Sequence, residues 1–307
     1  MSPRMAYLLC LVGVCGHASS EFVAKLADTP GPEFTVWRFM IGGAGLLVMT
    51  RFWPGNHDLV GPLRREGLRI TLLSCLGMAL GQLIFHWALD FTSVVQVATI
   101  VTAIPIFFVI FDRLINGAPL APPKVVSGIG AFLAVILLMT NGAGLSTGPD
   151  DLIGTALALA CGGLGGLYLV LAKPLVGRYG PVRMTAYTFV IGFFFLYVVV
   201  GSFWGTWVNP MSIFEKTGQQ VAGILTIGLW NTAIAMSAWL AGLAAAPDGQ
   251  RANYLFFLKP VIAAFLAVAI LGDQLTLLQV LAILAICLCV GVEYLWTRAR
   301  GGWRRSE

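Results

Sequence analysis

Apolar stretches long enough to cross a membrane recur along almost the whole chain of 307 residues. A transmembrane helix needs about 20 mainly apolar residues. We count ten such stretches, at about residues 5–27, 33–52, 68–89, 92–112, 123–140, 151–172, 182–201, 220–243, 251–271 and 275–296. Charged residues form only 11% of the chain, against about 25% in soluble domains. The sequence therefore predicts an all-α integral membrane protein of ten transmembrane helices.

Basic residues are distributed unevenly between the predicted loops, and this pattern orients the chain. With the N-terminus in the cytoplasm, most of them fall on the cytoplasmic side: Arg51, Arg64, Arg65, Arg69, Arg113, Lys124, Lys173, Arg178, Arg183, Arg251, Arg298, Arg300, Arg304 and Arg305. The positive-inside rule then predicts that both termini are cytoplasmic in a multi-pass protein of the inner (plasma) membrane. Because the net charge of +5 resides in these loops and the C-terminal segment, we expect a lipid bilayer and no nucleic acid as partner.

The chain repeats a pattern at a constant spacing of 155 residues. The residues that recur are Pro105, Gly117, Leu120 and Val125, matched by Pro260, Gly272, Leu275 and Val280. Ten spans divide into five plus five, and an odd number per copy makes the second copy cross in the opposite sense. We therefore predict two inverted five-helix repeats around a central cavity, residues 1–145 and 146–307, the second ending in a short basic cytoplasmic tail. Such repeats are typical of secondary transporters.

Lys259 lies beside Pro260 in an apolar stretch, at the position that Ile104 occupies in the first copy. A charged side chain at the bilayer centre costs at least about 2.5 kcal/mol, so it normally faces a partner, a cavity or a substrate. We interpret Lys259 as a binding residue for an anionic substrate group; a fixed pairing with a carboxylate or carbonyl is the alternative. Pro105 and Pro260 are expected to kink their helices and free backbone groups to line a cavity.

Three polar residues of the first span, His17, Glu21 and Lys25, follow one another at intervals of four and share a helix face. Glu before Lys at this spacing favours an ion pair, which is one interpretation. The other assigns coupling or gating to Glu21, His17 and Lys25, with Arg38 of the second span beside them. Proton coupling through Glu21 is then a hypothesis.

Further candidates for substrate binding are polar or aromatic residues inside predicted spans. They are Gln82, His86, Tyr168, Trp230, Asn231, Asn253 and Tyr254. Amides and rings inside a membrane protein can hydrogen-bond or stack on a ligand, but they equally tie helices together or form aromatic belts.

These features together resemble the drug/metabolite transporter superfamily, in particular its ten-span EamA-type members. The resemblance rests on Leu258-Lys259-Pro260-Val261, Leu271-Gly272-Asp273 and the matching Ala103-Ile104-Pro105. It implies a secondary active transporter that moves a small polar metabolite, an amino acid or related organic acid, most often outward by alternating access. A translocase for a lipid or lipid-linked group is the alternative. His17 stands where relatives often have Trp, and Asp273 where they have Glu.

Signatures of an enzyme are missing from the sequence. There is no His-Glu-x-x-His, no pair of membrane aspartates, and no Gly-Lys-Ser/Thr of a phosphate-binding loop. We therefore expect no catalytic residues, no cofactor, no metal and no ATP site, so that a solute gradient drives transport.

Overall fold

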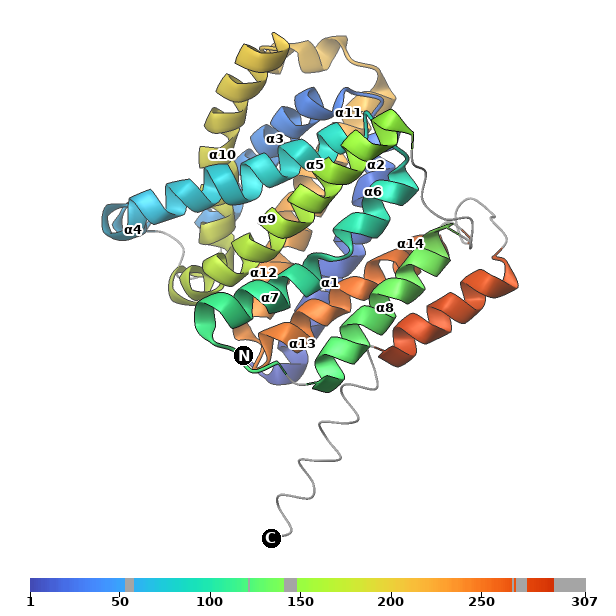
Figure 1. Ribbon diagram of the computed structural model, residues 1–307. Coiled ribbons are helices and arrows are strands. Elements are labelled where there is room, and N and C mark those ends of the chain that lie inside the picture. The colour runs from blue at the N-terminus through green and yellow to red at the C-terminus, as the bar shows by residue number, and fades with distance from the viewer. Residues whose placement is uncertain (53–57, 121, 141–147, 267, 269–274, 290–307) are drawn as a thin grey trace.

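The computed structural model describes residues 1–52, 58–120, 122–140, 148–266, 268 and 275–289 (Figure 1). All regular structure within these ranges is helical. The predicted all-α class is therefore confirmed for the described part of the chain.

The first part of the chain forms a series of helices and helical turns up to the gap at residue 141. They are α1 (Pro3–Ala18), α2 (Ser20–Leu26), α3 (Gly31–Phe52), α4 (Gly61–Leu72), the π-helical η1 (Leu73–Ala79), α5 (Leu80–Ala88), α6 (Val94–Val101), α7 (Ile104–Asn116) and α8 (Pro122–Thr140). Helices α4, η1 and α5 are continuous, so a π-helical segment lies inside one long helix.

The second part begins with two long helices and then repeats this pattern. Its elements are α9 (Pro149–Tyr179), α10 (Pro181–Trp204), the 3-10 helix η2 (Pro210–Glu215), α11 (Gly218–Leu225), the π-helical η3 (Thr226–Met236), α12 (Ser237–Ala245), α13 (Gly249–Tyr254), the 3-10 helix η4 (Leu255–Leu258) and α14 (Lys259–Leu266). A short apolar helix, Leu277–Cys289, follows.

Six helical segments in the described ranges are long and apolar enough to cross a membrane. They are Pro3–Ala24, Gly61–Ala88, Val95–Asn116, Pro149–Tyr179, Pro181–Trp204 and Gly218–Ala245. Two shorter apolar helices, Val125–Thr140 and Leu277–Cys289, lie beside them. The chain is therefore a multi-pass membrane protein. By helix length and composition, six candidate spans are found in the described residues, against ten predicted from the sequence.

Several helix ends differ from the predicted spans. The third predicted span, 68–89, belongs to a helix that begins at Gly61, and the sixth, 151–172, continues to Tyr179. Hydropathy indicates only the part of a helix that lies in the lipid, whereas the helix itself can extend into water as a segment rich in charged residues. In these extensions, Glu66 of α4 and Arg178 of α9 form an ion pair. The first span is interrupted at Ser19, whose backbone N–H bonds to the carbonyl of Gly16 at 3.2 Å.

The repeat seen in the sequence reappears as paired helix breaks. In the first copy, α6 ends at Val101 and α7 begins at Ile104. In the second copy, α13 passes into η4, and α14 begins at Lys259, which is 155 residues after Ile104. Pro105 and Pro260 each follow as the second residue of the new helix, where a missing N–H costs no hydrogen bond. The π-helical segments η1 and η3 also overlap when shifted by 155 residues. The predicted interruptions at both prolines are confirmed.

Close helix crossings hold the centre of the bundle together. Helix α3 packs against both α10 and η3. Phe39 of α3 and Phe189 of α10 have ring centroids 4.3 Å apart. At Gly42, a Cβ atom would lie 2.6 Å from the Cγ2 of Thr232, so only glycine permits this approach of α3 to η3. The crossing brings the middle of α3 next to the second part of the chain.

Candidate functional site

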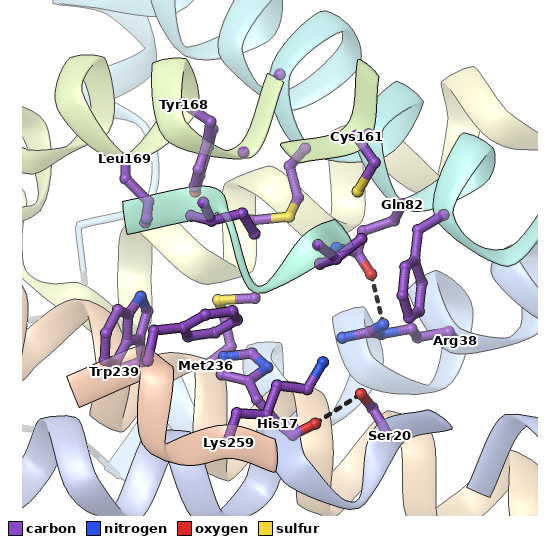
Figure 2. Close-up of a pocket in the computed structure, with 18 residues that line it drawn as sticks. His17, Ser20, Arg38, Gln82, Cys161, Tyr168, Leu169, Met236, Trp239 and Lys259 are labelled. Carbon is purple, nitrogen blue, oxygen red and sulfur yellow. Dashed lines mark hydrogen bonds between the residues drawn. The ribbon is translucent and has the colours of Figure 1, made fainter. Parts of the chain in front are cut away.

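A central cavity lies between helices from both parts of the chain (Figure 2). The first part contributes residues of α1 to α3, η1 and α5 to α7, and the second contributes residues of α9, η3, α12, η4 and α14. The cavity has about 690 Å³ of empty space, counted out to its opening.

Arg38 of α3 is one of two cationic side chains among the lining residues, and it is only 2% exposed. Its Nη1 donates to Oε1 of Gln82 at 2.5 Å, and its Nε donates to Oγ1 of Thr232 at 3.0 Å. Gln82 belongs to α5 in the first part of the chain and Thr232 to η3 in the second, so the Arg38–Thr232 bond joins the two parts. Both Arg38 and Gln82 were predicted from the sequence, and both line the cavity.

Lys259, the second cation, is the first residue of α14 and is 4% exposed. Its Nζ lies 5.6 Å from the ring centroid of Phe256 and 5.9 Å from that of Phe85. Ammonium groups at this distance from a ring face are attracted by its quadrupole. The lining thus holds two cationic side chains, of which Lys259 lies beside aromatic rings, and this favours an anionic group as the occupant.

Aromatic rings form another part of the wall. The His17 ring contacts Trp239 and Phe256, with centroids 6.4 and 5.9 Å away. Tyr168 of α9 is 2% exposed, and its hydroxyl lies 3.3 Å from the hydroxyl of Thr188. These rings can cover the apolar part of a bound molecule while the cations hold its charged part.

Besides His86, four predicted substrate-binding residues lie outside this lining. Trp230 is 38% exposed, and the Asn231 amide donates to the carbonyl of Gly16 and, at 3.0 Å, to the hydroxyl of Ser19. Both residues were chosen as a ring and an amide inside a predicted span, without a choice of helix face, and the π-helical η3 has a different residue period from an α-helix. Met236 of η3 reaches the cavity instead.

The other two of these residues, Asn253 and Tyr254, precede the 3-10 turn in the ninth predicted span. Tyr254 packs against Phe257, with ring centroids 5.7 Å apart, in a cluster with residues of α8. Asn253 is fully buried, and its amide has no hydrogen-bond partner within the described part of the chain. The turn η4 changes the helix face, so that Phe256 and Lys259 line the cavity and these two residues do not.

His86 lies in a second cavity, one helical turn from Gln82 on α5. Its Nδ1 is 2.8 Å from the hydroxyl of Thr35. The side chains of Glu21 and Lys25 lie outside what the structure describes, so their predicted coupling or gating role has no structural counterpart here.

Several lining residues were not predicted, and some of them occupy equivalent positions in the two copies. Gly81 and Met236, like Val101 and Phe256, are 155 residues apart, and all four line the cavity. The pair Ile104 and Lys259 does the same. The repeat thus places equivalent residues on the cavity lining, although the sequence itself marked neither Gly81 nor Val101.

A multi-pass helical protein with one buried, charged cavity between its two parts has the architecture of a membrane transporter. Sequence comparison agrees with this class. The EamA-like transporter family matches residues 4–140 and again residues 152–292. The chain belongs to this family, which confirms the resemblance to the drug/metabolite transporter superfamily.

Curated relatives carry names of the same kind. An uncharacterized transporter of Archaeoglobus fulgidus is 24% identical over 278 residues, 89% of this chain and 91% of the relative. The uncharacterized transporter YyaM of Bacillus subtilis is 27% identical over 268 residues, 83% of this chain and 81% of the relative. A solved crystal structure covering 97% of this chain and 99% of its own superposes with a TM-score of 0.76 at 17% identity, which shows a shared fold.

Proposed function

We propose that this protein is a secondary active transporter for a small polar metabolite with a carboxylate, such as an amino acid or related organic acid, and that it acts mainly in export. The proposal rests on one observation: two buried cationic side chains, Arg38 and Lys259, line the same cavity. Guanidinium groups bind carboxylates with two parallel hydrogen bonds, and an ammonium adds a point charge. Gln82 adds an amide to the same wall.

Transport by alternating access is supported by the origin of the lining. We propose ten spans in two inverted repeats, residues 1–145 and 146–307, that rock against each other around the central cavity. Both repeats line that cavity, and both contain a π-helical segment and a helix break that reaches it. Irregular backbone at membrane depth is tolerated where it lines a cavity, and paired broken helices are a feature of transporter sites.

We propose an inner-membrane location with both termini cytoplasmic. Basic residues at the ends of α4, α9 and α10 support this orientation, since they gather on the side of the bundle where the N-terminus lies (Figure 1). Arg69 and Arg178 both bind Glu66 there, and Arg183 donates to the carbonyl of Asp58 at 2.8 Å.

Proteoliposome transport tests the proposal. Radiolabelled amino acids and organic acids are offered to the wild-type protein, to Lys259→Met and to the matched control Lys216→Met, whose lysine pairs with Glu33 away from the cavity. We expect one class of carboxylate to be transported by the wild type and the control and lost in Lys259→Met. Equal transport by all three proteins would contradict the proposal, and transport of lipid-linked groups alone would favour the translocase alternative.

We further propose that proton movement through Glu21 drives transport. The support is the sequence position of Glu21, between His17 and Ser20 of the cavity lining and the start of the second cavity at Ala24. Transport is measured with and without a pH gradient. Glu21→Gln should abolish the response to the gradient, and full gradient-driven transport by this variant would overturn the coupling proposal.

A further inference from the structure

The structure has a second cavity, whose lining comes from elements at the end of the bundle away from the N-terminus; Figure 1 shows where α2, α3, α5 and α6 meet there. We call this cavity the vestibule. It has about 870 Å³ of empty space, counted out to its mouth, between α2, the start of α3, the end of α5 and the turn before α6. Its polar lining residues are Asp28, Thr29, His86, Asp90, Thr92 and Ser93.

The vestibule and the central cavity are stacked along the same helices. On α3, Arg38 lines the central cavity and Phe34, one turn earlier, lines the vestibule. On α5, Gln82 lines the central cavity and His86, one turn later, lines the vestibule. A solute that leaves the central cavity along these helices would therefore enter the vestibule next.

The hydrogen bonds of His86 leave an acceptor atom without a donor. Thr35 donates its single hydroxyl hydrogen to the carbonyl of Gly31 at 2.7 Å, so it accepts from Nδ1–H of His86 at 2.8 Å. In the neutral ring, Nε2 then carries a lone pair. His86 is 1% exposed, and Nε2 has no hydrogen-bond partner among the described residues. Such buried acceptors normally have a donor from the protein, from ordered water or from a ligand, and a donor bound in the vestibule would supply one here.

Two carboxylates give the vestibule the opposite charge to the central cavity. Asp90 accepts from the backbone N–H of Gly31 at 3.3 Å, and partial burial raises the pKa of its carboxyl group. Asp28 has a φ of 41°, a left-handed conformation that aspartate tolerates better than most residues. Strained backbone of this kind is concentrated at ligand sites and switch regions. Among the described lining residues, both formally charged groups of the vestibule are acidic.

We propose that the vestibule is a second binding site, which takes the ammonium group of a small molecule. Asp28 and Asp90 supply negative charge, and Nε2 of His86 accepts one ammonium hydrogen. The described residues contain no cluster of three or more potential metal ligands, which favours an organic cation over a metal ion. If the proposed function is correct, an amino acid would be held first by its carboxylate in the central cavity and then, after moving along α3 and α5, by its ammonium group in the vestibule.

The site can be tested without the central cavity. Full-length protein labelled with 15N-histidine is titrated with propylammonium chloride, with 1-propanol as the matched neutral probe and sodium chloride at equal ionic strength. The chain has three histidines, and His86→Gln assigns the His86 signal. We expect a saturable shift of the His86 Nε2 resonance with propylammonium alone, an at least tenfold weaker apparent affinity in Asp90→Asn, and no change in Lys259→Met.

The His17 resonance serves as the folding control, because His17 lies in the central cavity. A variant counts as folded when this resonance and the thermal unfolding midpoint match the wild type. An equal response to 1-propanol, a shift of His17 in place of His86, or unchanged affinity in both Asp28→Asn and Asp90→Asn would overturn the vestibule proposal. Since propylammonium has no carboxylate, these outcomes are independent of whether the central cavity binds one.

Discussion

Ile104 and Lys259 occupy equivalent places in the two repeats, yet they differ in charge. Each is the first residue of a helix, each precedes a proline, and each lines the central cavity. The helix break thus recurs in both copies, whereas the charge is present in one. Lys259 therefore gives the second repeat a positive charge at a place where the first repeat has an apolar side chain. The fold is therefore repeated while the chemistry is specialised.

The largest expected effect comes from making the two positions alike. Lys259→Ile gives the second copy the residue of the first and removes a charge-assisted contact to the substrate. Hydrogen bonds to charged groups contribute about 1.5–3 kcal/mol, so substrate affinity should fall about 10- to 100-fold. Binding and proteoliposome transport are the measurements. Unchanged affinity in a folded variant would show that the asymmetry is unrelated to binding.

The reciprocal exchange sharpens the same comparison. In the double variant Ile104→Lys with Lys259→Ile, the ammonium enters the same cavity from the other repeat. We expect about tenfold recovery of affinity relative to Lys259→Ile alone, because part of the electrostatic attraction is restored. The double variant is compared with both single variants in one binding assay. If it binds no better than Lys259→Ile, the position of the charge matters and its mere presence does not.

A smaller effect is expected at a bond within the first repeat, on the Arg38 side chain that also contacts the second repeat. Gln82→Leu removes the acceptor for Nη1 of Arg38 and leaves its bond to Thr232 in place. Loss of one partner of a buried charged group costs about 1–3 kcal/mol, which should lower the thermal unfolding midpoint. Met78→Leu, also in the cavity lining, is the control for changes of shape. A midpoint equal to that of wild type would mean that the bond is not formed in solution.

The smallest effect concerns two equivalent helix starts that are capped differently. The Asp58 carboxylate accepts from the backbone N–H groups of Val60 and Gly61 at 3.0 and 2.7 Å, and these bonds lower its pKa. In the second repeat, the neutral Thr217 caps α11 through Gln220. A lowered pKa stabilises the fold above the ordinary aspartate pKa, and the contribution is lost as pH falls through the folded value.

Thermal unfolding as a function of pH checks this difference between the repeats. Wild-type protein should lose stability on acidification below the ordinary aspartate range, and Asp58→Asn should show a smaller loss over that range. Thr217→Ala should lower the midpoint by the same amount at every pH, since its hydroxyl does not titrate. An identical acid profile in wild type and Asp58→Asn would contradict the assignment.

The sequence was informative where one residue type has a strong physical preference. A lysine in an apolar stretch must find a polar environment, and Lys259 lies in the cavity lining. Proline interrupts helices, and breaks lie directly before Pro105 and Pro260. The sequence could not show which face of η3 meets the cavity: Trp230 and Asn231, chosen as a ring and an amide inside a span, lie outside the lining, and Met236 reaches it. The vestibule was also missed, because Asp28 and Asp90 are distant in sequence.

Ligand-induced thermal stabilisation, measured with carboxylates and their carboxamides, tests the central claim most directly. Amino acids and organic acids that stabilise the wild-type protein are each compared with the amide of the same skeleton, and both are repeated with Lys259→Ala. An anion-binding cavity predicts stabilisation by the carboxylate, little by the carboxamide, and loss of the difference in Lys259→Ala. Equal stabilisation by acid and amide, unchanged in the variant, would contradict it.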